Sequence, residues 1–138
     1  MHIKLMKAFE YDSTGWNCQE TSARHPALDE MQTAVRRLNK FEYPFVWFFD
    51  VEDVRNDAIP NFSIMGGDGD YVLSSFDGER RDRHMTFPSH SAELVEVWLS
   101  DQGCEIQEKF VCHDLSFVLD VLANFAKTGK FPADAIWE

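Results

Sequence analysis

The sequence predicts an α+β domain in which a mostly antiparallel sheet of about six strands carries two packed helices. One reason is a strand, a glycine-rich turn and a second strand over residues 61–78. Another is that two segments, 26–39 and 114–129, repeat apolar residues at helical spacing. The length of 138 residues suits one domain, residues 1–138, and no linker long enough to divide it is present.

The first elements are a strand and a helix. Residues 3–11 alternate loosely between apolar and polar side chains, and their lysines suggest an edge strand. Residues 12–15 predict a turn, whereas residues 16–24 are polar and give no periodic signal. A helix follows from Pro26 to about Asn39, because Pro suits the first helical position and the apolar residues recur every three or four positions.

The middle of the chain predicts the centre of the sheet. Residues 43–51 are apolar on both faces, which is typical of a strand covered on two sides. The hairpin then joins 62–65 to 71–76 through Gly66-Gly67-Asp68-Gly69-Asp70, where glycine supplies the positive φ that a tight turn needs. Residues 77–84 predict a charged loop, and 85–87 add a few strand residues.

The last third predicts a second hairpin and a second helix. Residues 93–99 and 104–112 alternate and are joined by a turn, so they predict an antiparallel pair. Asp114 suits the N-cap of the following helix, and Gly129 suits its left-handed C-terminal cap. Residues 135–138 bring apolar bulk back to the core.

The charge balance bears on the partners. With 24 acidic and 13 basic residues, the formal net charge is −11. This charge argues against binding of nucleic acid, because phosphate contacts need Lys and Arg. It favours a cationic partner or serves solubility alone. The sequence shows no apolar run long enough for a membrane span and no signal-peptide pattern. Its three cysteines suit a reducing compartment. We therefore expect a cytoplasmic protein that does not bind membranes.

No residue pattern predicts catalysis, a cofactor or a metal site. The glycine-rich turn lacks the lysine of a phosphate-binding loop and the oxygen ligands of a calcium loop, so a tight hairpin with an acidic tip is the better interpretation. Cys104, Cys112 and His113 do not have the close spacing of a zinc site. We interpret His25, His84 and His90 as surface residues or helix caps, and we expect no enzyme activity.

Acidic residues concentrate in three places of the predicted fold. The connection after the central strand carries Asp50, Glu52, Asp53 and Asp57. The hairpin tip carries Asp68 and Asp70. The second hairpin carries Glu93, Glu96, Glu105 and Glu108. If these segments share one rim of the sheet, they form a negative surface that steers a basic partner. The alternative, unrelated solvated charges, stays open.

Several features of residues 28–138 occur together in one known family. They are a helix ending at Leu38, a strand at 45–49, the turn Ile64-Met65-Gly66-Gly67-Asp68-Gly69 with Tyr71 beyond it, a strand pair around Trp98 and Phe110, and a final helix that runs into Gly129-Lys130-Phe131-Pro132 and closes on Ile136-Trp137-Glu138. In these features the chain resembles a family of bacterial immunity proteins from polymorphic-toxin and contact-dependent competition systems, an α+β family with a C-terminal Trp. The first 25 residues carry no part of this resemblance.

The resemblance implies a protein without enzyme activity that binds and neutralises a cognate toxin domain, here a basic nuclease- or deaminase-type effector. The alternative is a small cytosolic regulatory or scaffold domain. We expect a monomer or weak homodimer with structural roles for Gly66, Gly67, Gly69 and Trp137. The expected partner-binding residues are Asp50, Glu52, Asp53, Asp57, Asp68, Asp70 and Tyr71.

Overall fold

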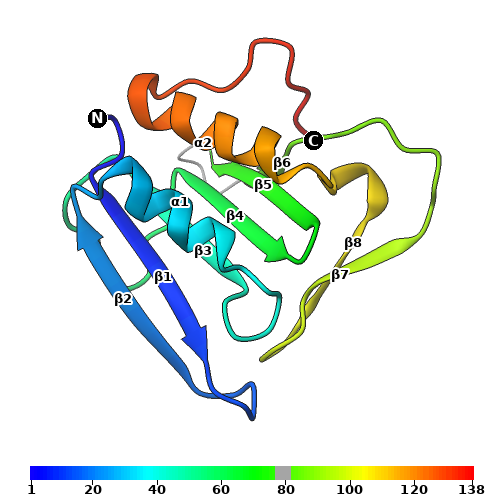
Figure 1. The fold of residues 1–138 in the computed structure, drawn as a ribbon, viewed down its shortest axis with the longest axis horizontal. Coiled ribbons are helices and arrows are strands. Elements are labelled where there is room, and N and C mark those ends of the chain that lie inside the picture. Colours follow the sequence, from blue (N-terminus) through cyan, green and yellow to red (C-terminus); the bar gives the residue numbers. More distant parts are fainter. Residues whose placement is uncertain (77–81) are drawn as a thin grey trace.

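The fold is centred on a six-stranded antiparallel sheet with the strand order β2-β1-β3-β4-β5-β6 (Figure 1). The computed structural model describes residues 1–76 and 82–138. The strands of this sheet are β1 Leu5–Tyr11, β2 Cys18–Arg24, β3 Phe45–Phe49, β4 Phe62–Gly67, β5 Asp70–Phe76 and β6 Asp82–His84. Every neighbouring pair is antiparallel. The predicted α+β fold with about six strands is therefore confirmed.

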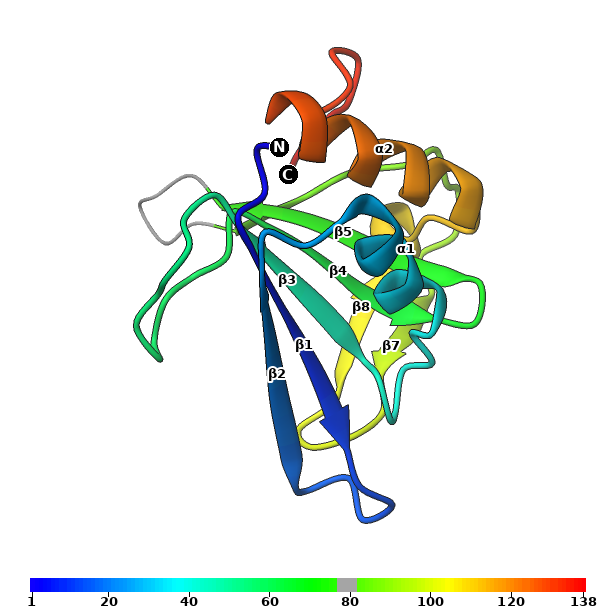
Figure 2. The same ribbon diagram turned by 60° about the vertical axis from the view of Figure 1, so that its left-hand side comes forward.

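Both helices, α1 (Leu28–Arg36) and α2 (Leu115–Thr128), lie on the same face of this sheet (Figure 2). The core between sheet and helices contains the fully buried side chains of Met31, Phe62 and Leu122. Each such side chain contributes about 1.5–3 kcal/mol by leaving water. This core holds the two helices against the sheet.

The ends of α2 follow the prediction. Asp114 caps the first turn, because its carboxylate accepts a hydrogen bond of 3.3 Å from the amide of Phe117. Gly129 ends the helix at φ = 72°, and its amide donates to the carbonyl of Phe125 at 2.8 Å. Local sequence therefore decides where this helix begins and ends.

The central strand is β3, which pairs with β1 on one side and with β4 on the other. Its alternate side chains reach two different clusters, since neighbours in a strand point to opposite faces. Phe48 belongs to the core under the helices, whereas Phe45 and Trp47 pack with Phe9 on the other face. The prediction of a strand that is apolar on both faces is confirmed.

The edge of the sheet differs from the prediction. Residues 18–24 form β2, which pairs along all of β1, so β1 is an inner strand and not an edge strand. The side chains of β2 are almost all exposed, and this explains why it shows no alternation. Lys7 of β1 is buried beside the ring of Phe49, and its Nζ lies 3.4 Å from Glu20 Oε1.

The second hairpin, β7 (Leu94–Trp98) and β8 (Cys104–Gln107), forms its own two-stranded sheet and does not extend the main sheet. It packs on the face opposite the helices, where Val97 of β7 is buried against Val72 and Met65. The second predicted strand ends early, because Glu108–Phe110 forms a 3-10 turn.

Part of the charged loop predicted at 77–84 is a strand. Asp82–His84 is β6, which pairs with the end of β5, whereas 77–81 lie outside the described residues. Met85 then forms a bridge with Trp137 in the C-terminal segment. Within residues 1–76 and 82–138, no helix combines the length and the apolar character that crossing a membrane requires.

Candidate functional site

Three acids of the connection between β3 and β4 each lie close to a basic side chain. Glu52 Oε1 lies 2.8 Å from Nε2 of His25, Asp53 forms an ion pair with Arg24, and Asp57 Oδ1 lies 3.7 Å from Nε of Arg55. The remaining acid of this segment is Asp50, which is half-buried; its backbone amide donates to Asn61 Oδ1 at 2.9 Å. Most of the negative charge that the sequence places here is therefore paired locally.

The connection and the β4–β5 tip, which the sequence predicts to form one surface, lie at opposite ends of β4. The connection precedes β4 and the tip follows it, so the length of the strand, roughly 20 Å, separates them. Tyr71 is also unavailable to a partner, since its side chain is 4% exposed and lies in the core under the helices. Asp68 is exposed at the tip, whereas Asp70 is half-buried.

The glycines of the tip sit where the backbone is crowded. Gly66 and Gly67 have φ = 121° and 130°. A Cβ at Gly66 would lie 2.0 Å from the carbonyl oxygen of Asp70, and one at Gly67 would lie 2.2 Å from that of Leu38. Gly69 has φ = 93° and open space around it. Gly67 thus allows the tip to pack against the chain that follows α1, whereas Gly66 allows the two strands of the hairpin to approach each other.

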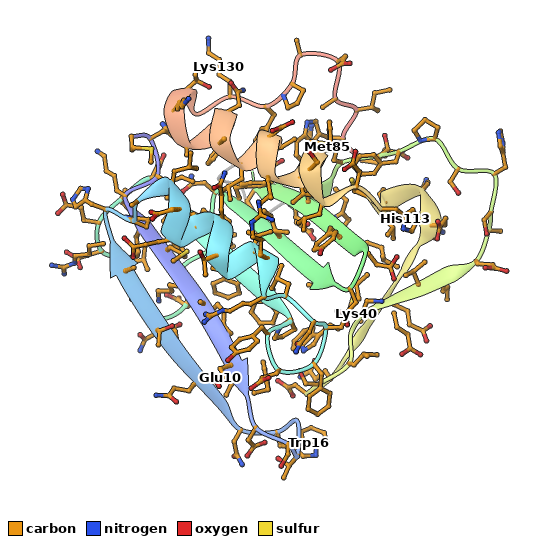
Figure 3. All side chains as sticks on the ribbon, viewed as in Figure 1. Glu10, Trp16, Lys40, Met85, His113 and Lys130 are labelled. Atoms are coloured by element: carbon orange, nitrogen blue, oxygen red, sulfur yellow. The ribbon has the colours of Figure 1, made fainter. Side chains whose placement is uncertain are left out.

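A network of charged side chains ties the tip to its surroundings. Lys40 Nζ donates to Asp70 Oδ2 at 2.6 Å, and Asp70 Oδ1 lies 2.9 Å from Nδ1 of His113. Nε2 of the same ring lies 2.6 Å from Glu108 Oε1. Lys40 and His113 lie on either side of the tip (Figure 3). The network joins the segment after α1, the β4–β5 hairpin and the start of α2.

His113 favours its protonated form in this network. The hydrogen bond with Glu108 raises the pKa of His113 above 6.5. The carbonyl of Gly69 and the charge of Asp70 raise this pKa further, whereas partial burial lowers it. A carboxylate lies near each ring nitrogen, and only an imidazolium can donate from both nitrogens. Asp70 and Glu108 therefore stabilise the fold, and their charges are largely engaged within the molecule.

Trp137 lies at the edge of the core. Its ring meets that of Phe131 at 4.8 Å between centroids, and Phe131 stacks on Phe125 of α2 at 4.7 Å. The C-terminal backbone pairs beside β6, where the amide of His84 donates to the carbonyl of Glu138 at 2.8 Å. Trp137 covers this end of the core after α2.

A groove at the end of β1 gathers acidic residues that the sequence did not single out. It has a volume of about 680 Å³, and its lining residues are Glu10, Tyr11, Asp12, Ser13, Asn17, Cys18, Gln19, Phe41 and Glu42. We call this the acidic groove. The amide of Tyr11 donates to the carbonyl of Glu42 at 2.8 Å, which brings the chain before β3 alongside the end of β1.

The carboxylates of the acidic groove form no ion pair with a described residue, and the nearby cation Arg37 stacks instead on the ring of Tyr43, 4.4 Å from its centroid. No Lys, Arg or His is among the lining residues, and no ion pair between described residues involves Glu10, Asp12 or Glu42. Glu10 accepts a hydrogen bond of 3.2 Å from the Tyr43 hydroxyl. Hydrogen bonds from Thr14 and Asn17 lower the pKa of Asp12 to about 2, so Asp12 is ionised at neutral pH.

An exposed aromatic side chain lies in the turn that contributes Asp12, Ser13 and Asn17 to this groove. Trp16 in the β1–β2 turn is 70% exposed, and Figure 3 shows it at the same end of the molecule as Glu10. The turn itself is held in place, because the amide of Asp101 in the β7–β8 turn donates to the carbonyl of Gly15 at 2.5 Å. The Tyr11 hydroxyl also donates to Asp101 Oδ2 at 3.3 Å.

The groove offers little nucleophilic chemistry. Burial raises the pKa of the Cys18 thiol. Nearby carboxylates raise this pKa further, whereas hydrogen bonds with Tyr11 and with the backbone of Glu10 lower it. Burial likewise raises the pKa of Tyr11. Both groups therefore stay protonated at neutral pH, and a thiol in that state is a poor nucleophile. Among the described residues, no group of three or more metal-ligating side chains is close enough to hold a metal ion.

The fold and the groove define a small α+β domain that presents unpaired negative charge. Neither family models nor curated proteins give a match to the chain. The chain is similar in structure to a hypothetical protein from Neisseria gonorrhoeae, whose crystal structure aligns with a TM-score of 0.56 and 12% sequence identity. The alignment covers 97% of this chain and 94% of that chain. At this identity, the likeness concerns the fold alone.

Proposed function

We propose that this chain is an immunity protein that binds a cognate bacterial toxin domain and blocks it. The observation that carries the proposal is the acidic groove. Its lining includes Glu10, Asp12 and Glu42 but no Lys, Arg or His, and the chain as a whole has a net charge of −11. A toxin domain that handles nucleic acid needs a basic surface, and an acidic inhibitor is complementary to such a surface. The sequence resemblance to immunity proteins points in the same direction.

Binding of this kind needs a moderate part of the surface. A stable complex buries about 800 Å² on each partner. The surface of this chain measures 7805 Å², so the contact would cover roughly a tenth of it. Such a contact needs no catalytic group on the inhibitor, because blocking the substrate surface of the toxin is sufficient.

The test is to search the genes that flank this chain's gene for a toxin domain, to purify that domain and to mix the two proteins. We expect a complex in size-exclusion chromatography at micromolar concentration and loss of the toxin's activity at equimolar ratio. Absence of a complex at that concentration would reject the proposal. A complex that leaves the toxin fully active would instead support a regulatory or scaffold domain.

A further inference from the structure

The acidic groove and Trp16 combine the two features that protein interfaces share, an aromatic anchor and a polar rim. Glu10, Glu42 and Phe41 are among the residues that line the groove, whereas the ring of Tyr11 packs in the cluster with Phe9 and Phe45. The indole of Trp16 stands beside it with most of its surface in water. This is the part of the described chain where an exposed ring and unpaired charge lie together.

We propose that the acidic groove receives an arginine or lysine side chain from a basic segment of another protein, while Trp16 packs against that protein's surface. The inference rests on the proposed function for the identity of the partner, a basic toxin domain. It adds the surface of this chain that makes the contact and the chemistry that the contact recognises.

Charge complementarity selects a basic protein as the occupant. A guanidinium group that enters the groove approaches the acidic residues Glu10, Asp12 and Glu42, and their negative charge favours a cation. Nucleic acid would be repelled by the same carboxylates. A second copy of this chain would bring its own negative groove, so like charges would oppose that contact.

Trp16 is suited to act as the anchor. Trp is enriched among the residues that dominate binding energy, and its removal at such a position commonly costs 2 kcal/mol or more. Within the described chain, the indole of Trp16 belongs to none of the buried clusters, and its 70% exposure leaves it free for a partner.

The test uses an acetylated and amidated peptide of four arginines as the probe, titrated into isotope-labelled protein and followed by NMR. Three proteins are compared: the wild type, the groove variant Glu10→Gln/Glu42→Gln and the control variant Glu52→Gln/Asp57→Asn. Both variants remove two negative charges, but the control residues Glu52 and Asp57 already have a basic side chain beside them, His25 and Arg55.

We expect the peptide to shift the signals of Trp16 and the groove residues in the wild type and the control variant. In the groove variant, we expect its affinity to fall on the order of 10-fold, since each lost charge-assisted hydrogen bond removes part of the binding energy. Shifts spread over all acidic segments would overturn the inference. Equal affinity in the groove variant, or no shift at millimolar peptide, would overturn it as well.

A second arm uses the toxin domain and separates this inference from the proposed function. We expect Trp16→Ala to raise the Kd on the order of 30-fold. Leu94→Ala, which removes another exposed apolar side chain, should leave it within about 2-fold. If neither Trp16→Ala nor the groove variant changes the Kd of the toxin complex, the inference about this surface is overturned, whereas the proposed function is not. Binding of the peptide to the groove without any toxin complex would overturn the proposed function alone.

Discussion

The tip of the β4–β5 hairpin and the acidic groove lie at the same end of the main sheet, yet they use their polar residues in opposite ways. At the tip, Asp70 bonds to Lys40 and His113, so its charge is engaged within the molecule. At the groove, Glu10 and Glu42 have no cation among the described residues that line it. In this protein, the dense run of glycine and aspartate at the tip stabilises the contact between neighbouring segments. The surface that is available to a partner is formed by acids that are scattered in the sequence.

This contrast predicts that substitutions at the tip reduce stability, and the largest effect is expected at Gly67. In Gly67→Ala, the new methyl group would lie 2.2 Å from a backbone carbonyl at an unfavourable φ, and neither group can move easily. We expect the free energy of unfolding to fall by at least about 3 kcal/mol. Urea denaturation measures it.

Gly69→Ala is the matched control for this substitution. It has positive φ but no neighbouring atom within 4 Å, so it keeps the backbone cost without the collision. We expect a loss of about 1–2 kcal/mol. Equal losses for the two variants would mean that the close approach of the tip to Leu38 does not stabilise the fold.

Asp70 should have the next largest effect. In Asp70→Asn, Lys40 and His113 lose the carboxylate that both contact, and the side chain of Lys40 is largely buried. We expect a loss of about 2 kcal/mol in urea denaturation, less than for a fully buried pair. Asp68→Asn changes an exposed acid of the same tip and should stay within about 0.5 kcal/mol. Similar values for both would show that the network contributes nothing.

His113 gives the tip a smaller effect that depends on pH. Its pKa is raised in the folded state, so its stabilising contribution is complete below pH 6.5 and is lost as the pH rises through the folded pKa. The ring is about half exposed, and solvent screening limits the change to less than about 1 kcal/mol.

The contribution of His113 is measured as the stability difference between the wild type and His113→Gln across pH 5.5–9. Taking this difference cancels opposing groups, such as His84, whose pKa is lowered chiefly by burial. We expect the difference to shrink as the pH rises. A constant or growing difference would contradict the ion pairs of His113 with Asp70 and Glu108. His90→Gln, in an exposed segment, serves as the control.

The smallest effect on stability is expected at the groove. Trp16→Ala removes a side chain that is 70% exposed, so we expect the free energy of unfolding to stay within about 0.5 kcal/mol of the wild type. A thermal or urea denaturation curve measures this. A loss above 1 kcal/mol would mean that the indole packs on this chain and is not held for a partner.

The sequence predicts the elements whose signals are local. The cap at Asp114, the terminator Gly129 and the strand 45–49 all carry their own patterns, and the structure confirms them. The strand β2 carries no such pattern, because its side chains face water and only its pairing with β1 makes it a strand. The same limit applies to the second hairpin, whose placement on the opposite face depends on Val97 meeting Val72.

The candidate surface was harder to predict than the fold. Glu10 and Glu42 are distant in sequence and meet only because the chain before β3 runs beside the end of β1. The acids of the connection are more closely clustered in the sequence, but the fold places Arg24 beside Asp53 and His25 beside Glu52, and these two basic residues come from the end of β2 and the residue after it. An exposed Trp16 in a polar turn was the one local signal of the groove.

The central claim is that the charge of the acidic groove, and not the total charge, directs the partner. The most direct measurement is the association rate with the toxin domain for Glu10→Gln/Glu42→Gln and for Glu52→Gln/Asp57→Asn at low and high salt. We expect the groove variant to associate on the order of 3- to 10-fold more slowly at low salt with a weaker salt dependence, and the control to match the wild type. Equal rates for the two variants would contradict the claim.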